Sequence, residues 1–348
     1  MKTKIIKINN IAEQREELEI CADIIKAEGL VIFPTETVYG LGANALSVLG
    51  ASKIYEAKGR PSDNPLIIHV ARPEDASLYA YTSDTYFRLA DKFMPGPLTV
   101  IMRARDIVPL KTRGGLDTVA VRCPENPIAR ELIFLSGVPI AAPSANLSGS
   151  PSPTTPEHVI DDMLGRVDAI IDGGICEFGL ESTIVKIEDD GSLTLLRPGK
   201  ITPDDLLSVT EKVNIAGAVT NALGEGEVAL SPGMKYRHYA PKAPLTLLQG
   251  DIERVLAFLS DIDTDNAALI AYNEHIDLIK ASFPTLKVYP FGLMEDEEKQ
   301  ARSLFAILRE IDKENFRIIY APLPREEGIG LALYNRMIRA SSHNIINL

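Results

Sequence analysis

Two cations two residues apart, Lys58 and Arg60, are well suited to hold a phosphate group. Gly59 and Pro61 flank Arg60 and set the course of the backbone around it. If both cations faced one cavity, an anion would have to neutralise them, and phosphate suits ammonium and guanidinium groups well. As an isolated pair, the same residues would be ordinary surface charges. Local sequence leaves both interpretations open.

Other polar side chains lie where apolar runs begin or end. His69 belongs to the apolar run 66–70, where a histidine is either a core residue or a ligand-binding one. Arg122 follows the run 119–121 and needs a partner if buried, either a ligand carboxylate or a structural Asp or Glu. Ser144 and Asn146 stand where a strand meets a loop, which fits ligand binding or turn chemistry. Ser182 carries no signal on its own.

Common nucleotide and hydrolase signatures are missing from the sequence. The segment 197–201 lacks the first glycine and the Ser/Thr of a Walker A loop, and no Gly-x-Gly-x-x-Gly follows an expected strand. No Gly-x-Ser-x-Gly elbow or His-Glu-x-x-His is present. A phosphate site must therefore be assembled from scattered side chains, and we expect no dedicated metal site.

Composition and charge narrow the class of protein. A length of 348 residues favours two domains, and 45% hydrophobic with 24% charged residues is typical of a globular protein. Three widely spaced cysteines and the lack of an apolar run of ~18 residues predict a soluble protein of the reducing cytoplasm, without a membrane segment. The net charge of −12 argues against a non-specific nucleic-acid surface. Residues 53–122 hold 11 basic and 8 acidic residues, or +3, which suits a small anion.

Hydrophobic periodicity, caps and turn residues predict an α/β fold with a mixed sheet in the first 200 residues. We expect its site at the corners where strands end. The expected helices cover 10–28, 47–57, 84–93, 126–135 and 155–164. The expected strands cover 30–33, 66–70, 98–102, 119–121, 139–142 and 167–171, with a hairpin of 182–187 and 193–196.

Regular alternation of strands and helices resumes after residue 244 and predicts a smaller Rossmann-like α/β domain. Its expected strands are 245–248, 267–272, 286–289 and 317–320, and its expected helices are 251–259, 295–312 and 330–339. The predicted division is a catalytic domain at 1–210, a linker at 211–243 and a C-terminal domain at 244–348. The polar cluster 231–241 within the linker is interpreted as either a lid or a simple tether.

The combined motifs resemble the threonylcarbamoyl-AMP synthase family, in its long form of a YrdC-like domain followed by a C-terminal domain. Six motifs occur in the family's order, and the resemblance covers essentially the whole chain. These motifs are 34–41, 58–61 with 64–66, 95–99, 121–124, 142–149 and 181–185. The turn 197–199 and the cluster 231–241 match the long form. The resemblance implies a twisted mixed sheet with helices around an open cavity.

The resemblance also implies a reaction. L-threonine, bicarbonate or CO2, and ATP would give threonylcarbamoyl-AMP and pyrophosphate, for N6-threonylcarbamoyladenosine formation next to the tRNA anticodon. Mg2+ would arrive with ATP. Anions meet in such a site, so cations must offset their repulsion, and positioning can replace an enzyme nucleophile. The expected partner is the downstream tRNA threonylcarbamoyl-transfer machinery, whereas the net charge does not support a direct tRNA contact.

Residue roles follow from the same resemblance. Lys58 and Arg60 are expected to hold the triphosphate and to stabilise developing charge. The residues expected around threonine are Thr35, Lys58, His69, Arg122, the Ala142 backbone and Ser182, with Arg122 facing the carboxylate. Those expected around the nucleotide are Arg60, Asn64, Thr118, Ser144, Asn146 and Ser152. Arg197, Tyr236 and Arg237 are expected to complete the nucleotide site from outside.

Two other functions compete with this one. An RNA-binding regulatory module could use the same basic cavity, although the acidic net charge and the lack of an RNA-recognition aromatic motif disfavour it. A carbamoyl-transfer component of hydrogenase maturation also contains a YrdC-like domain, but it needs zinc-finger cysteines that this chain lacks.

Overall fold

The computed structural model describes residues 2–221 and 238–348, which form two compact units. Of the described residues, the first unit comprises 2–148 and 152–221, and the second comprises 149–151 and 238–348. Among the described residues, no helix is long and apolar enough to cross a membrane. The same ranges contain no cluster of three His, Cys, Asp or Glu side chains able to hold a metal ion.

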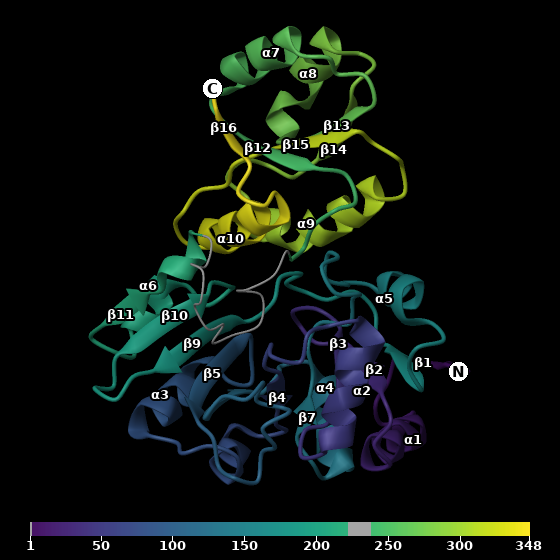
Figure 1. The fold of residues 1–348 in the computed structure, drawn as a ribbon, viewed down its shortest axis with the longest axis vertical. Coiled ribbons are helices and arrows are strands. Elements are labelled where there is room, and N and C mark those ends of the chain that lie inside the picture. Colours follow the sequence, from purple (N-terminus) through teal and green to yellow (C-terminus); the bar gives the residue numbers. More distant parts are fainter. Residues whose placement is uncertain (1, 222–237) are drawn as a thin grey trace. The chain divides into compact units, whose positions relative to one another are not determined.

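An eleven-stranded mixed sheet forms the first unit, in the order β1-β8-β2-β3-β7-β4-β6-β5-β9-β10-β11 (Figure 1). Its strands are β1 (Lys4–Lys7), β2 (Val31–Phe33), β3 (Gly40–Asn44), β4 (Ile67–His69), β5 (Leu98–Arg103), β6 (Thr118–Arg122), β7 (Ile140–Ala141), β8 (Ala169–Asp172), β9 (Thr183–Ile187), β10 (Leu193–Arg197) and β11 (Val213–Ile215). Its helices are α1 (Arg15–Lys26), α2 (Val48–Lys58), η1 (Pro73–Leu78), α3 (Asp84–Phe93), α4 (Pro127–Ser136), α5 (Pro156–Met163), α6 (Pro203–Leu207) and η2 (Gly217–Val219). The mixed sheet expected from the sequence is confirmed.

Helix α2 ends where it does for a local reason. Ser47 caps its first turn by accepting a hydrogen bond from the Gly50 N–H at 3.0 Å. At the other end Gly59 adopts a left-handed φ of 63°, which a residue with a Cβ adopts only at a cost. The Arg60 N–H then returns to the Tyr55 carbonyl at 2.9 Å. Lys58 is thereby left in the last helical turn, with Arg60 immediately beyond it.

Several elements of the first unit differ from the prediction, which also lacked β1, β11, α6 and the two short helices η1 and η2. Strand β3 was not expected, because its sequence is rich in glycine and lacks β-branched residues. A Cβ at Gly42 would lie 2.8 Å from both Ile140 and Phe33, so close packing explains the glycine. The first helix begins at Arg15 instead of Asn10, since the Asn10 side chain accepts from the Ala12 N–H in a turn before the helix.

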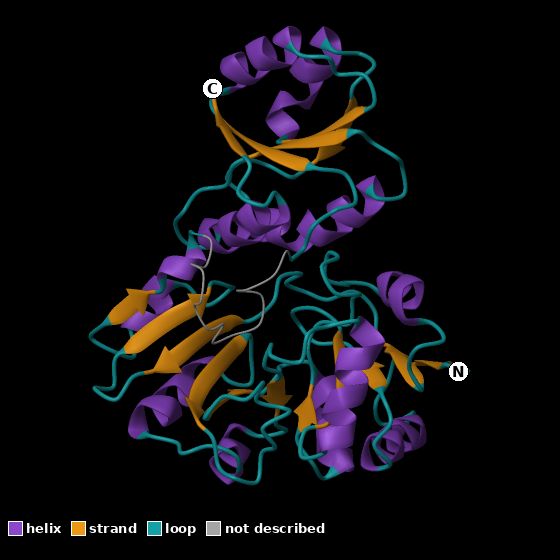
Figure 2. Ribbon diagram, in the orientation of Figure 1, coloured by secondary structure: helices purple, strands orange, loops and turns teal. Residues whose placement is uncertain are grey.

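The second unit is a small doubly wound domain, as expected for its Rossmann-like pattern (Figure 2). Its five parallel strands lie in the order β14-β13-β15-β12-β16. They are β12 (Leu245–Gln249), β13 (Ala267–Ala271), β14 (Lys287–Pro290), β15 (Ile318–Pro322) and β16 (Ile345–Asn347). Helices α7 (Ile252–Asp261) and α8 (Ile276–Ser282) cover one face, and α9 (Glu297–Ile311) and α10 (Gly330–Ala340) cover the other. A short helix, η3 (Asn273–His275), precedes α8.

The expected linker is only partly described. Strand β11 lies within 211–243 and pairs with β10 in the first sheet. Tyr236 and Arg237 fall in 222–237, outside the described residues, as does most of the lid predicted at 231–241. Of the rest, Tyr239 is buried, stacking on Phe305 with ring centroids 5.3 Å apart. Tyr239 is therefore a packing residue of the second unit.

Candidate active site

The parallel pair β4–β6 carries candidate residues at both of its ends. At the carboxyl end the register places His69 opposite Arg122, and β5 places Thr99 opposite Arg122 from the other side. At the amino end Asn64 precedes β4 and Thr118 begins β6. The four residue steps from Thr118 to Arg122 span ~13 Å at the rise of a strand. The sheet therefore separates His69 and Arg122, two candidates for threonine, from Asn64 and Thr118, two of those for the nucleotide.

Arg122 is paired with a carboxylate of its own chain. Its Nη2 lies 2.6 Å from Glu36 Oε1 and also donates to Thr37 Oγ1 at 2.9 Å. The other Glu36 oxygen accepts from the Glu125 N–H at 3.2 Å. A structural acid, one of the two partners considered from the sequence, is thus present. The Arg122 Nε is buried without a hydrogen-bond partner among the described residues, so the guanidinium keeps an unused donor.

A hydroxyl network joins Thr35 to this ion pair. Thr35 Oγ1 donates to the Val38 carbonyl at 2.6 Å and lies 2.8 Å from Thr37 Oγ1. Because Thr35 has one hydroxyl hydrogen, Thr37 must donate to Thr35 while accepting from Arg122. These hydrogen bonds fix the corner after β2 in a single arrangement, in which Thr37 links the Thr35 hydroxyl to the Arg122 guanidinium.

His69 is buried and neutral. Its Nδ1 lies 3.3 Å from the Ile140 carbonyl, which can only accept, so Nδ1 carries the hydrogen. Burial, with the neighbouring Arg122 charge, lowers the pKa of His69 to about 3. The Nε2 lone pair is therefore a hydrogen-bond acceptor at neutral pH and a poor general base. The histidine is a core residue, and it remains a candidate ligand-binding group at the carboxyl end of the β4–β6 pair.

This burial makes the first unit sensitive to acid. Because the pKa of His69 in the folded state lies below the unfolded value of 6.5, the unfolded chain takes up an extra proton as pH falls from about 6.5 towards 3. Stability should be lost in that window by up to ~1.4 kcal/mol per pH unit. The free energy of unfolding, measured in urea at pH 6, 5 and 4, should fall more steeply with decreasing pH in the wild type than in His69→Gln. The difference between the two slopes should correspond to about one proton. Equal slopes would contradict the assignment.

Ser182 connects the carboxyl end of the β4–β6 pair, where His69 and Arg122 lie, to Arg197. Its hydroxyl lies 2.8 Å from Thr99 Oγ1 and accepts from Arg197 Nη2 at 3.1 Å. The Arg197 Nε also donates to the Ser182 carbonyl at 3.0 Å. Since Thr99 is opposite Arg122 in the sheet, Ser182 and Arg197 continue the same row of polar groups. Arg197, expected at the nucleotide, thus contacts a residue expected at threonine.

Lys58 binds two backbone carbonyls. Its Nζ donates to the Ser144 and Asn146 carbonyls, both at 2.5 Å, and Lys58 is only 3% exposed. The Ser144 hydroxyl donates to Asn146 Oδ1 at 2.6 Å. Three predicted residues from two separate motifs therefore form one cluster. The alternative that Lys58 and Arg60 are surface charges is wrong, since both are buried.

Arg60 and Asn64 lie together before β4. Arg60 Nη2 donates to the Pro65 carbonyl at 3.1 Å, and the Tyr55 hydroxyl donates to the Asn64 carbonyl at 3.0 Å. The Asn64 side-chain oxygen is buried with no partner in the described part of the chain. An unsatisfied buried acceptor is costly, and it points to a donor that the described residues do not supply.

Replacing Asn64 with leucine should separate stability from binding. A buried amide whose oxygen lacks a partner costs free energy, so the similarly sized apolar side chain should leave the unfolding free energy unchanged or raise it by ~1 kcal/mol. The KM for ATP should rise about tenfold, because a nucleotide donor loses its acceptor. Denaturant unfolding and steady-state kinetics check both effects. Strong destabilisation with an unchanged KM would assign Asn64 to structure alone.

Ser152 and Ala142 are held by the surrounding backbone and side chains. The buried Ser152 hydroxyl donates to Glu181 Oε1, which ties the loop after Asn146 to the segment before β9. The Ala142 N–H donates to the Ile67 carbonyl at 2.9 Å, which fixes Ala142 beside the start of β4.

Sequence reasoning assigned no role to four residues that hold the site together. They are Glu36, Thr37, Thr99 and Glu181. All four lie inside the motifs that carried the resemblance, which is the signal that could have found them. Each acts on a residue far away in the chain, and only strand pairing reveals those contacts.

Buried cations, hydroxyls and an amide lie at the strand ends of the mixed sheet, and a doubly wound unit follows in the chain. This combination defines a two-domain protein of the YrdC-like class. Residues 23–199 match the Sua5/YciO/YrdC family, described as "Telomere recombination". Residues 201–342 match the threonylcarbamoyl-AMP synthase C-terminal domain. The chain belongs to the threonylcarbamoyl-AMP synthase family, which confirms the resemblance.

Individual relatives match over nearly the whole length. The threonylcarbamoyl-AMP synthase of Pyrococcus abyssi is 41% identical over 345 residues, covering 98% of this chain and 99% of the relative. That of Bacillus subtilis is 38% identical over 355 residues, covering 99% and 100%. The crystal structure of P. abyssi Sua5 complexed with L-threonine superposes with a TM-score of 0.90 at 38% identity, covering 100% of each chain.

Proposed function

We propose that this chain is a threonylcarbamoyl-AMP synthase, which condenses L-threonine, bicarbonate or CO2, and ATP into threonylcarbamoyl-AMP and pyrophosphate. Full-length relatives of that name support the activity. The observation that carries it in this structure is the row His69, Arg122 and Ser182 at one end of the β4–β6 pair, with Asn64 and Thr118 at the other. These two sets of residues offer separate groups for an amino acid and for a nucleotide.

In this proposal the threonine end binds by shape and charge. Arg122, fixed by Glu36, directs donors at the threonine carboxylate. His69 accepts a hydrogen bond at Nε2, from the amine or the hydroxyl of threonine. Thr35, Ser182 and the Ala142 carbonyl complete this end. A P. abyssi relative whose structure is described as complexed with L-threonine supports the assignment.

The nucleotide end supplies positive charge. Lys58 and Arg60 hold the triphosphate, and Asn64, Thr118, Ser144, Asn146 and Ser152 hold the other nucleotide groups, with Arg197 alongside. Carboxylation of the threonine amine gives a carbamate, with loss of a proton when CO2 is used or of water when bicarbonate is used. The carbamate oxygen attacks the α-phosphorus, the bond to the β,γ-pyrophosphate breaks, and pyrophosphate leaves. Cations stabilise the charge that develops on these oxygens, and no covalent enzyme intermediate is required. Mg2+ enters with ATP as the partner of pyrophosphate.

A direct assay tests the function. Purified protein is incubated with ATP, L-threonine and labelled bicarbonate, and products are separated by chromatography. We expect label in an AMP adduct only when threonine is present, together with stoichiometric pyrophosphate. Folded protein that forms no threonine-dependent labelled adduct would refute the proposal.

Further parts of the proposal concern the context of the reaction. The labile product passes to tRNA threonylcarbamoyl-transfer machinery in the cytoplasm. The RNA-binding alternative is not favoured, since full-length relatives carry the name of the enzyme. Salt-dependent tRNA binding without ATP turnover would reverse that preference.

A further inference from the structure

The second unit contains a cavity that has no part in the proposed reaction. It has a volume of about 370 Å³, within the range of small-molecule sites. It lies at the carboxyl ends of β12, β13 and β15, where Leu248, Ala271 and Pro322 line it. All of its lining residues belong to the second unit.

The topology of the sheet explains why a cavity forms there. After β12 and β13 the chain crosses the sheet through α7 and α8 on one face, whereas after β15 it continues to α10 on the other face (Figure 1). The chain therefore leaves β13 towards one face of the sheet and leaves the neighbouring strand β15 towards the other face. A crevice opens at such a switch point, and doubly wound proteins commonly bind ligands in it.

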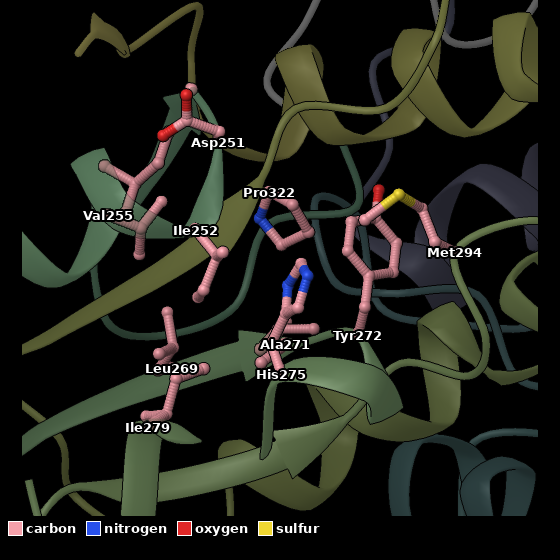
Figure 3. A pocket seen from close by; sticks show the side chains of 13 residues that line it. Asp251, Ile252, Val255, Leu269, Ala271, Tyr272, His275, Ile279, Met294 and Pro322 are labelled. Atoms are coloured by element: carbon pink, nitrogen blue, oxygen red, sulfur yellow. The ribbon is translucent and has the colours of Figure 1, made fainter. Parts of the chain in front are cut away.

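The walls favour an apolar, ring-containing ligand. Ile252 and Val255 of α7, with Leu269 of β13, supply aliphatic surface. Tyr272 and His275 add two aromatic rings with centroids 6.1 Å apart, and in Figure 3 the His275 ring projects into the space between Ile252 and Tyr272. No other described residue hydrogen-bonds the Tyr272 hydroxyl or the His275 ring nitrogens, so both remain available to a ligand.

The rim excludes phosphates. In nucleotide-binding domains the glycine-rich turn after the first strand and the helix N-terminus cradle the phosphates. Here a single Gly250 is followed by Asp251, whose carboxylate accepts from the Arg254 N–H at 3.0 Å. A negative charge already occupies the position that a phosphate would take. An anionic ligand would meet Coulomb repulsion and find no free cradle of N–H groups.

Acidic residues also predominate on the opposite side of the cavity. The Glu274 carboxylate accepts from the N–H of the lining residue Met294 at 2.9 Å. Glu295 and Glu297 follow directly and share one cation, Arg325, at 3.1 and 3.0 Å. Burial raises the pKa of Tyr272 to about 12, Arg325 opposes the rise and the three glutamates add to it, so the hydroxyl stays a donor. The local potential therefore favours a neutral or cationic ligand.

We propose that this cavity is a binding site for a small aromatic molecule that is cationic or uncharged, with its ring between α7 and the Tyr272–His275 pair and its cationic group at the acidic rim. The site is separate from the catalytic residues, and it assigns a ligand-binding role to the second unit.

Three indoles that share one ring and differ in charge test the proposal. Binding of tryptamine, indole and indole-3-acetate to the full chain is measured by calorimetry. We expect tryptamine to bind at least tenfold more tightly than indole-3-acetate, with indole between them. Equal affinity of the three compounds, or no saturable binding of tryptamine or indole, would overturn the proposal.

Two variants locate the binding. Val255→Trp fills the cavity from α7 and Ala271→Met fills it from β13, and each should weaken tryptamine binding at least tenfold. Leu278→Trp adds the same indole to an exposed position of α8 outside the lining, and should change binding less than twofold. All three should keep threonine-dependent synthesis, which shows that they are folded and keeps this test distinct from that of the proposed function. Tryptamine binding that persists in both cavity variants would place it elsewhere and refute the site.

Discussion

Replacing Lys58 with methionine should lower the rate of threonylcarbamoyl-AMP formation by about 10² to 10³-fold, the cost of losing one preorganised charge-stabilising group. The ammonium group is fixed by the Ser144 and Asn146 carbonyls and is shielded from water. In such a site a charge stabilises a developing oxyanion more strongly than it would in water. Methionine has a similar length and keeps most of the packing, so the loss should fall on kcat.

A matched control exists on the same helix. Lys53 also donates its Nζ to a backbone carbonyl, that of Glu28, at 2.7 Å, but it lies one turn earlier and contacts no candidate site residue. Lys53→Met should therefore share the stability cost of losing a lysine–carbonyl bond and should keep its activity. Steady-state kinetics and urea unfolding of both variants separate the two effects. A folded Lys58→Met enzyme within threefold of the wild-type rate would remove Lys58 from the proposed mechanism.

Replacing Glu36 with glutamine should raise the KM for threonine about tenfold while kcat changes less than threefold. Glu36 does not contact the reacting atoms in our proposal; it holds Arg122 in place, and both side chains are buried. Glutamine keeps the shape but leaves the guanidinium without its opposing charge. Breaking one side of a buried pair typically costs ~3 kcal/mol or more, so the first unit should also be destabilised. The KM for ATP should not change, because the proposal assigns the nucleotide to Asn64 and Thr118 at the other end of the strands.

A double-mutant cycle distinguishes this pair from general destabilisation. The double variant should lose much less unfolding free energy than the sum of the losses in the two single variants. The reason is that Arg122→Met removes the charge that Glu36→Gln leaves unpaired. Glu188→Gln provides the control, because Glu188 pairs with Lys186 at the same 2.6 Å but is about a third exposed. That change should cost at most ~1 kcal/mol and leave both KM values unaltered. Additive effects in the cycle, or equal rises in the KM for threonine and for ATP, would contradict a positioning role.

Local sequence determined a large part of this protein. Gly59, able to adopt a left-handed φ, ends α2 and leaves Lys58 and Arg60 next to each other at its terminus. Apolar runs and caps predicted the mixed sheet and the doubly wound second unit, because periodicity and capping depend on neighbours a few residues apart. The motifs indicated the family and, through it, the residues that now form the candidate site.

Tertiary structure decided what those residues do to one another. Arg122 meets Glu36 across 86 positions of sequence, and Lys58 meets the carbonyls of Ser144 and Asn146 across 86 and 88 positions. Such contacts follow from the order and register of strands brought together by burial, and no local pattern contains them. Local sequence therefore indicated only that Lys58 and Arg60 are neighbouring cations able to bind an anion. Only the folded sheet showed that Lys58 is buried against carbonyls and that His69 and Arg122 occupy the far end of β4 and β6 from Asn64.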